Sequence, residues 1–174
     1  MTTDFEGEIA VVLDGGPCRV GVESTIVDAS TSTPRLLRVG AISMQEIEEV
    51  IGQPLHVLNQ GEVAAPGTHS SHYAPRCRVE VLGADAVNAR AQDLLRDGKH
   101  VAVLAMIATS FEIPAGAVRL PSPETVDDYA RTLYARMREA DTLGVDTLLA
   151  VPPAPGGVGA AVVDRLQRAA TVLL

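Results

Sequence analysis

The residues best suited to bind an anion or an amino acid lie within the first forty positions. Ser24 stands in a β-branched stretch, residues 21–28, behind a Gly-Pro turn, and its hydroxyl can hydrogen-bond a carboxylate or a phosphate oxygen. Arg38 lies at the end of a second apolar stretch, and its guanidinium can clamp a polyphosphate through two parallel hydrogen bonds. On pattern alone, however, a serine on a strand is ordinary, and an edge-strand salt bridge explains the arginine equally well.

Two further segments could carry chemistry. Residues 66–75 form a loop rich in hydroxyls and imidazoles, which we interpret as a segment that docks into a neighbouring site. His69, His72 and Cys77 have zinc-ligand chemistry, but no fourth ligand lies at a suitable spacing, so no metal site is predicted. The glycines of residues 155–159 could hold an anion at a helix start, but the third glycine of a dinucleotide-binding pattern is missing. Close packing of helix on strand is the better explanation there.

Composition sets limits on both core and partners. Hydrophobic residues make up 47% of the 174 positions and charged residues 21%, which is typical of a globular protein. Aromatic residues are only 3%, so the core must be aliphatic. The 14 basic residues against 22 acidic ones do not support contact with double-stranded RNA or tRNA. Lys99 is the only lysine, so any phosphate binding must rely on arginines, hydroxyls and backbone amides.

Cysteine usage and apolar runs bear on the compartment. Cys18 and Cys77 are too few and too far apart to suggest a disulfide framework. The first residues are acidic, the opposite of a secretory signal, and no apolar run approaches a membrane span. We therefore expect a cytoplasmic protein with no membrane partner.

The elements that must position these residues fall into three zones. In the first, residues 1–58, three short strands are predicted, at residues 9–13, 24–27 and 35–39. A capping box of Ser43 and Glu46 predicts a short helix ending at Gly52. Residues 1–60 hold nine acidic residues against three arginines, a net charge of −6. Residues 59–76 have no hydrophobic period and are predicted to be a linker.

In the third zone, residues 77–174, strands and helices alternate. The predicted strands are residues 79–82, 101–106, 118–120 and 147–151. The predicted helices are a first one capped by Asp85 and ending before Gly98, a second opened by Ser122 and Pro123 and ended by Gly144, and a third at residues 158–170. Such alternation favours an α/β fold: a three-layer αβα, Rossmann-like domain with a mainly parallel sheet and right-handed connections.

Several of these segments occur in an order typical of one family. Residues 14–17, 20–28 and 37–40 resemble the last conserved stretch of a YrdC-like domain, with Val39 where the family usually has proline. Residues 66–76, with the His-Tyr-Ala-Pro motif, resemble the linker of its two-domain members, and residues 159–166 resemble the end of their C-terminal domain. The chain is thus similar to the C-terminal portion of the L-threonylcarbamoyladenylate (threonylcarbamoyl-AMP) synthase family.

The resemblance implies a nucleotidyltransferase that makes threonylcarbamoyl-AMP from L-threonine, bicarbonate and ATP, with Mg²⁺ accompanying the ATP. Its product would pass to tRNA-modifying transferase proteins that form N6-threonylcarbamoyladenosine at position 37 of tRNA. Carried over by motif, Ser24 contacts threonine, whereas Arg38 and Tyr73 contact ATP. None of the three is a nucleophile, so their roles would be positioning and electrostatic stabilisation, and no catalytic residue in the strict sense is predicted.

The chain also departs from the family. The N-terminal Lys-x-Arg element, the early threonine-binding segment and the Ser-Ala-Asn segment have no counterpart, and Lys99 lies in the other domain. We therefore expect residues 1–58 to be part of a YrdC-like catalytic domain that lacks some of its active site. Two alternatives remain: a non-catalytic module that binds nucleotide at residues 156–159, and a purely structural or regulatory domain that holds the linker in place.

Overall fold

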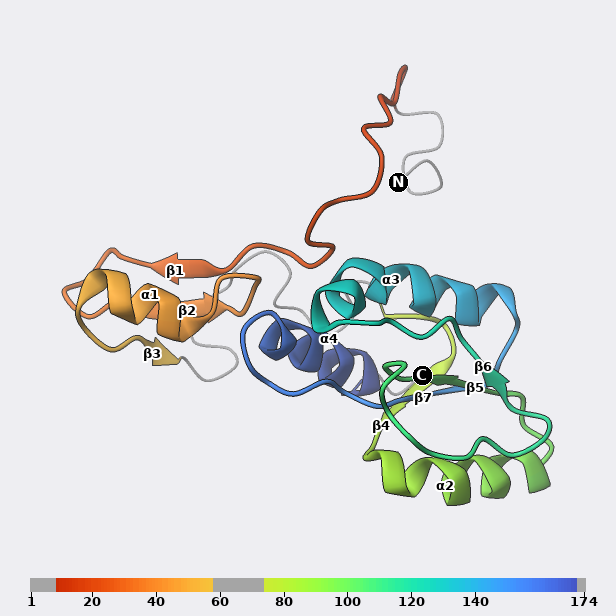
Figure 1. Cartoon of the computed structure of the whole chain (residues 1–174). Coiled ribbons are helices and arrows are strands. Elements are labelled where there is room, and N and C mark those ends of the chain that lie inside the picture. The colour runs from red at the N-terminus through yellow and green to blue at the C-terminus, as the bar shows by residue number, and fades with distance from the viewer. Residues whose placement is uncertain (1–8, 58–73, 172–174) are drawn as a thin grey trace.

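The computed structural model describes residues 9–57 and 74–171, which form two sheets (Figure 1). The smaller sheet, of order β1-β2-β3, is built from β1 (Ile26–Asp28), β2 (Arg35–Arg38) and β3 (His56–Val57). β1 pairs antiparallel with β2, and β2 pairs parallel with β3. Helix α1 (Met44–Ile51) connects β2 to β3. β1, β2 and α1 confirm the sequence prediction, whereas the two-residue strand β3 was not predicted.

Helix α1 forms where its local signals place it. The Ser43 side chain accepts a hydrogen bond from the Glu46 amide, and the Glu46 carboxylate accepts one from the Ser43 amide at 2.8 Å. Gly52 ends the helix with a φ of 70°, a conformation that glycine adopts without a Cβ penalty. No side chain of α1 is buried, so these caps, rather than packing, define the helix.

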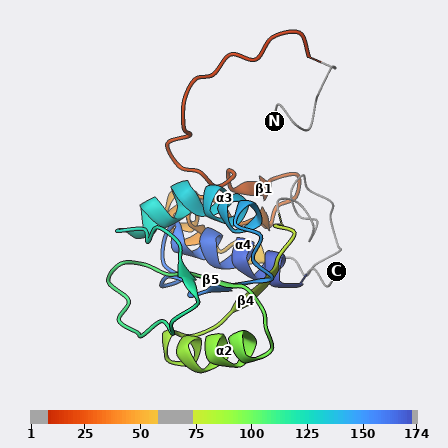
Figure 2. The ribbon, with the colours of Figure 1, turned by 90° about the vertical axis from the view of Figure 1, so that its right-hand side faces the viewer.

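The predicted strand at residues 9–13 is wrong. These residues have no regular secondary structure, and Val11 and Leu13 are 74% and 91% exposed. Their backbone groups find no neighbouring strand within the described part of the chain, and an isolated strand leaves those groups unpaired. Figures 1 and 2 both show this part of the chain, in red, running away from the layered body.

The larger sheet is entirely parallel, of order β4-β7-β5-β6, and confirms the predicted α/β fold with a parallel sheet. Its strands are β4 (Arg78–Val81), β5 (Val101–Leu104), β6 (Val118–Arg119) and β7 (Thr147–Ala150). The connecting helices are α2 (Ala84–Arg96) and α3 (Val126–Thr142), and α4 (Gly159–Thr171) follows β7. Helix α2 covers one face, and α3 and α4 cover the other (Figure 2).

The two faces of this sheet form two separate cores. β5 and β7 are buried throughout, and successive side chains of a strand point to opposite faces. Val103 and Leu149 pack with α2, whereas Leu104 and Leu148 pack with α3 and α4. Because helices cover both faces of the sheet, β5 and β7 are almost entirely apolar in sequence.

Two helix starts differ from the prediction. Helix α2 has Gly83 as its N-cap, with no side-chain hydrogen bond, so Asp85 lies in the first turn rather than capping it. Helix α3 begins at Val126, capped by Thr125, whose hydroxyl accepts from the Asp128 amide at 3.1 Å. The hydroxyl of Thr125 thus supplies the cap that sequence analysis assigned to Ser122 and Pro123.

Candidate functional site

The hairpin of β1 and β2 brings the two predicted ligand-binding residues together. Arg38 pairs with Ile26 across the hairpin, and a bulge between Ile26 and Val27 shifts the register beyond that pair. Asp28 closes the other end, where Ser30 and the Arg35 guanidinium hydrogen-bond it and lower its pKa to about 2. An antiparallel hairpin of this kind places Ser24, just before β1, beside the end of β2.

Arg38 and Ser24 are bonded directly. The Arg38 Nε donates to the Ser24 carbonyl at 2.9 Å, and Nη2 donates to the Ser24 hydroxyl at 3.2 Å. The guanidinium therefore lies against the backbone just before β1, and its hydrogen bond orients the Ser24 hydroxyl. A cation and a hydroxyl in contact can together bind an anionic group such as a carboxylate or a phosphate.

Gly40 makes this approach of the two chain segments possible. A Cβ built on Gly40 would lie 2.1 Å from the Thr25 amide nitrogen and 2.4 Å from the Ser24 carbonyl carbon. Both neighbours are backbone atoms, so no side-chain movement could relieve the clash. The glycine that follows the arginine motif is thus required by the packing of its backbone against residues 23–25.

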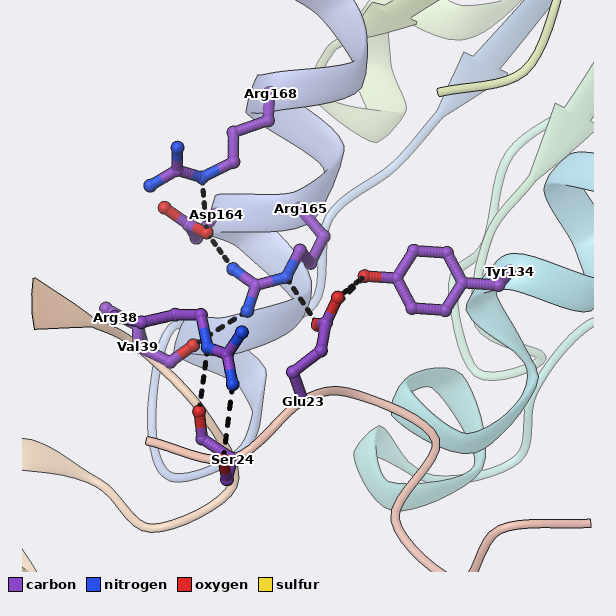
Figure 3. A network of polar contacts seen from close by, with 8 residues as sticks. All are labelled: Glu23, Ser24, Arg38, Val39, Tyr134, Asp164, Arg165 and Arg168. Atoms are coloured by element: carbon purple, nitrogen blue, oxygen red, sulfur yellow. Dashed lines mark hydrogen bonds and ion pairs between the residues drawn. The ribbon is translucent and has the colours of Figure 1, made fainter. Parts of the chain in front are cut away.

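A second polar cluster, which we call the Glu23 network, joins this hairpin to the larger domain (Figure 3). Arg165 on α4 donates through Nε to the Glu23 carboxylate at 2.8 Å and through Nη2 to the Val39 carbonyl at 3.0 Å. Tyr134 on α3 donates its hydroxyl to the same carboxylate, 3.0 Å from each oxygen. Asp164 accepts from the Arg165 Nη1, so every nitrogen of that guanidinium is engaged.

The network is ionised. Burial raises the pKa of Glu23, but the hydrogen bond and charge of Arg165, together with the Tyr134 hydroxyl, lower it further than burial raises it. Burial lowers the pKa of Arg165, and the Glu23 hydrogen bond and nearby carboxylates more than reverse this. The pKa of Tyr134 is raised, first by burial and then by the Glu23 charge, so its hydroxyl stays a donor. A carboxylate and a guanidinium therefore face each other at neutral pH.

Glu23, Tyr134 and Arg165 were not predicted to be site residues. One signal was available: Arg165 is spaced four residues from Ala161 and from Ala169, on the buried stripe of α4. A charged residue on such a stripe needs a partner, and Arg165 is only 5% exposed. Nothing local, however, indicates that its partner lies 142 residues earlier in the chain.

Other predicted site features fall outside this geometry. Tyr73 lies outside the described residues, as do His69 and His72. Burial and the Asp141 carboxylate raise the pKa of Cys77 to about 11, and no group of three potential metal ligands occurs within residues 9–57 and 74–171. A Cβ on Gly159 would lie 2.1 Å from the Ala154 carbonyl oxygen, which agrees with close packing at the glycine turn.

The chain matches a known protein family over most of its length. Residues 42–171 match the family model described as "Threonylcarbamoyl-AMP synthase, C-terminal domain". The match covers most of the chain, including all of the larger sheet and its helices. None of the helices in the described ranges is long and apolar enough to cross a membrane.

Curated relatives bear the same name. The threonylcarbamoyl-AMP synthase of Pyrococcus abyssi is 36% identical over 97% of this chain and 52% of its own length. That of Bacillus subtilis is 35% identical over 96% of this chain and 50% of its own length. The chain thus spans about half the length of these relatives.

Solved structures agree with this result. The crystal structure of Pyrococcus abyssi Sua5 complexed with L-threonine is 33% identical and superposes with a TM-score of 0.82 over 97% of this chain and 52% of that one. A double variant of the same Pyrococcus abyssi protein is 32% identical and superposes with a TM-score of 0.84, over 97% of this chain and 51% of that one. The superposition includes the smaller sheet as well as the larger domain, because the shared fraction is nearly the whole chain.

Proposed function

This chain belongs to the family of the threonylcarbamoyl-AMP synthase C-terminal domain, and from that premise we propose that it takes part in the synthesis of threonylcarbamoyl-AMP. In this reaction the amino group of L-threonine condenses with bicarbonate to form a carbamate, and water is released. The carbamate then attacks the α-phosphate of ATP, and pyrophosphate leaves. The product would be passed to transferase proteins that complete N6-threonylcarbamoyladenosine at position 37 of tRNA, in the cytoplasm.

The observation that carries this proposal is the contact between Arg38 and Ser24. The two residues resemble the family's ATP and threonine ligands, and the hairpin holds them within hydrogen-bond distance of each other. The reaction requires a carboxylate-bearing amino acid next to a polyphosphate, and a guanidinium beside a hydroxyl suits that pair of ligands. In this role, Ser24 binds a polar group of threonine and Arg38 stabilises charge on the ATP.

Tyr73 and Mg²⁺ complete the proposed site. Tyr73, from the linker, would close over the nucleotide and exclude water, as the family resemblance implies. Mg²⁺ would accompany the ATP, as the family resemblance implies, and would be held mainly through the ATP phosphates. Its chemistry there would be to neutralise charge as pyrophosphate leaves.

The residues that the structure describes before β3 carry few positive groups for holding a triphosphate. They include only Arg19, Arg35 and Arg38, and Arg35 is paired with Asp28. We therefore predict that the purified chain alone releases pyrophosphate from ATP slowly. The remaining cationic groups would come from the half of the relatives that this chain does not match.

A chimaera tests the proposal. This chain would replace the matching half of the Bacillus subtilis relative, and pyrophosphate release would be measured with Mg²⁺, ATP, L-threonine and bicarbonate, omitting each substrate in turn. We expect release that depends on threonine and bicarbonate and that is lost in a chimaera carrying both Ser24→Ala and Arg38→Ala. A folded chimaera without such release, or one unaffected by both substitutions, would contradict the proposed function.

A further inference from the structure

Arg165 is the most buried charged group that the structure describes. Its side chain is 4% exposed, although it lies on α4, in a different domain from the hairpin that it contacts. A buried guanidinium is costly unless each of its donors is satisfied. Two of its three nitrogens are satisfied by the hairpin rather than by its own domain, through Glu23 and Val39.

The two acceptors are sequence neighbours of the two proposed ligand-binding residues. Glu23 directly precedes Ser24, and Val39 directly follows Arg38. One side chain from α4 therefore holds the residue next to the hydroxyl and the residue next to the guanidinium, as Figure 3 shows. Removing the Arg165 side chain would take one hydrogen bond from each of the two segments that flank the Ser24–Arg38 contact.

Further contacts fix residues 21–23 against α3 and α4. Tyr134 holds the Glu23 carboxylate from the α3 side at 3.0 Å, so that carboxylate is fixed from two helices. Val22 is buried in the core that α3 and α4 share. A Cβ on Gly21 would lie 2.2 Å from the Arg131 Cα, which shows that the chain entering the hairpin lies directly on the backbone of α3.

From this arrangement we infer that Arg165 is a positioning residue, which sets the separation and orientation of Ser24 and Arg38 from the C-terminal domain. The inference rests on the proposed function for its consequence in ligand binding, but the positioning itself is a property of the chain alone. It gives the C-terminal domain a defined part in the reaction: it assembles the threonine and ATP contacts without touching either ligand.

Substitutions of Arg165 should disturb the hairpin to different degrees, according to the hydrogen bonds that the new side chain can make. Arg165→Met keeps the volume but removes every donor, so residues 23–25 and 38–40 should lose their fixed geometry. Arg165→Lys keeps the charge and one or two hydrogen bonds, but it cannot hold Glu23 and the Val39 carbonyl in the planar fork that arginine provides. Lysine should therefore rescue part of the effect.

A matched control exists in the same domain. Arg90 on α2 makes two 2.7 Å hydrogen bonds to Glu80, so it is an equally well-formed arginine–carboxylate pair. Arg90→Met removes that pair without touching the hairpin. It separates a general loss of stability from a loss of positioning.

The test has two measurements on the full chain. The first is amide hydrogen exchange, in which Arg165→Met should accelerate exchange of residues 23–25 and 38–40 at least tenfold, Arg165→Lys less, and Arg90→Met not at all. The second is the affinity for L-threonine in the chimaera described above, where Arg165→Met should weaken binding on the order of tenfold because the Ser24 hydroxyl is displaced from its binding position.

The outcomes are distinct. Unchanged exchange at residues 23–25 and 38–40 in Arg165→Met would overturn the inference, whatever the ligand data show. An equal effect of Arg165→Met and Arg90→Met on exchange there would also overturn it, since the role would then be general stability. If the unaltered chimaera binds neither threonine nor ATP, the proposed function fails, and the exchange measurement still decides the role of Arg165.

Discussion

Ser24 and Arg38 contact each other, and the details of this contact predict how their substitutions should differ. The Arg38 Nε is bound to the Ser24 carbonyl, which a Ser24→Ala change would keep. The guanidinium should therefore stay in place when the hydroxyl is removed. Arg38→Ala, in contrast, removes the cation and leaves the hydroxyl with one fewer partner.

We predict that Ser24→Ala weakens L-threonine binding by about 1–3 kcal/mol and changes ATP binding little, and that Arg38→Ala weakens ATP binding more than threonine binding. Titration calorimetry of the chimaera with each ligand separately would measure all four changes. If both substitutions affected both ligands equally, the assignment of one residue to each ligand would be wrong.

Glu23 should make stability depend on pH. Its pKa in the folded protein lies below the ordinary value of 4.5, so the unfolded chain binds its proton more readily. The carboxylate therefore stabilises the fold fully above pH 4.5, and this contribution is lost as the pH falls below that value. Glu23→Gln removes the contribution at every pH.

The expected result is a difference in free energy of unfolding between the unaltered chain and Glu23→Gln that is largest near neutral pH and shrinks below pH 4.5. Denaturant unfolding at several pH values would measure it. The control is Glu49→Gln, at an exposed position of α1, which should change stability by no more than about 0.5 kcal/mol. A difference that widens as the pH falls would contradict the prediction.

Two glycines with nearly equal φ angles test how the hairpin attaches to α3. Gly21 and Gly16 have φ angles of 83° and 81°, so an alanine at either position takes on a positive φ that costs roughly 1–2 kcal/mol. Only Gly21 is crowded: its Cβ would lie 2.5 Å from the Ala130 carbonyl oxygen, whereas Gly16 has open space.

We predict that Gly21→Ala detaches the residues before β1 from α3, and that Gly16→Ala leaves them attached. Hydrogen exchange of residues 22–25 would distinguish the two, because it should rise only in Gly21→Ala. Equal exchange in both variants would mean that the close approach to Arg131 does not hold this segment.

Elements with complete local signals could be predicted from the sequence. Helix α1 is an example, because Ser43, Glu46 and Gly52 lie within one short stretch and supply both ends. The order of strands and helices in the larger domain was also predictable, because its two central strands, β5 and β7, are buried on both faces and helical periods separate the strands. The sequence could not indicate that residues 9–13 pair with no strand in the described part of the chain, since pairing depends on the rest of the molecule.

The candidate site was predictable only in part, for the same reason. A serine and an arginine at positions 24 and 38 suggested binding of an anionic ligand, but only the pairing of β1 with β2 shows that the two residues are in contact. Arg165 and Glu23 meet because the residues before β1 pack against α3 and α4, and no periodicity or spacing carries that information. The residues that depend on long-range packing are the ones that sequence analysis missed.

At the scale of the whole molecule, apolar exposure is unevenly distributed. Most of the large apolar side chains that are exposed within the described ranges belong to residues 9–57, among them Val50 at 86%. The larger domain, in contrast, buries its apolar residues in two cores. Large exposed apolar surfaces favour association.

We therefore predict that residues 77–174, expressed alone, unfold in a single cooperative thermal transition and remain monomeric, whereas the full chain self-associates. Calorimetry and sedimentation velocity of the two proteins would test this. A broad melt without a transition for residues 77–174 would show that the larger domain depends on the hairpin. A monomeric full chain would show that the exposed apolar side chains do not drive association.

The strand order β4-β7-β5-β6 has a consequence for the growing polypeptide on the ribosome. β4 and β5 do not pair with each other; both pair with β7, which is synthesised after every other strand. The central strand of the sheet is therefore missing until Thr147–Ala150 has left the exit tunnel. The hydrogen bonds of Arg165 to Glu23 and Val39 form later still, because Arg165 follows β7 in the chain. The sheet of this domain is therefore completed late in synthesis, and the earlier strands must remain unaggregated until then. A chain that ended before residue 147 would contain the whole hairpin, but it would lack both the central strand of the larger sheet and the Arg165 that contacts Glu23 and Val39.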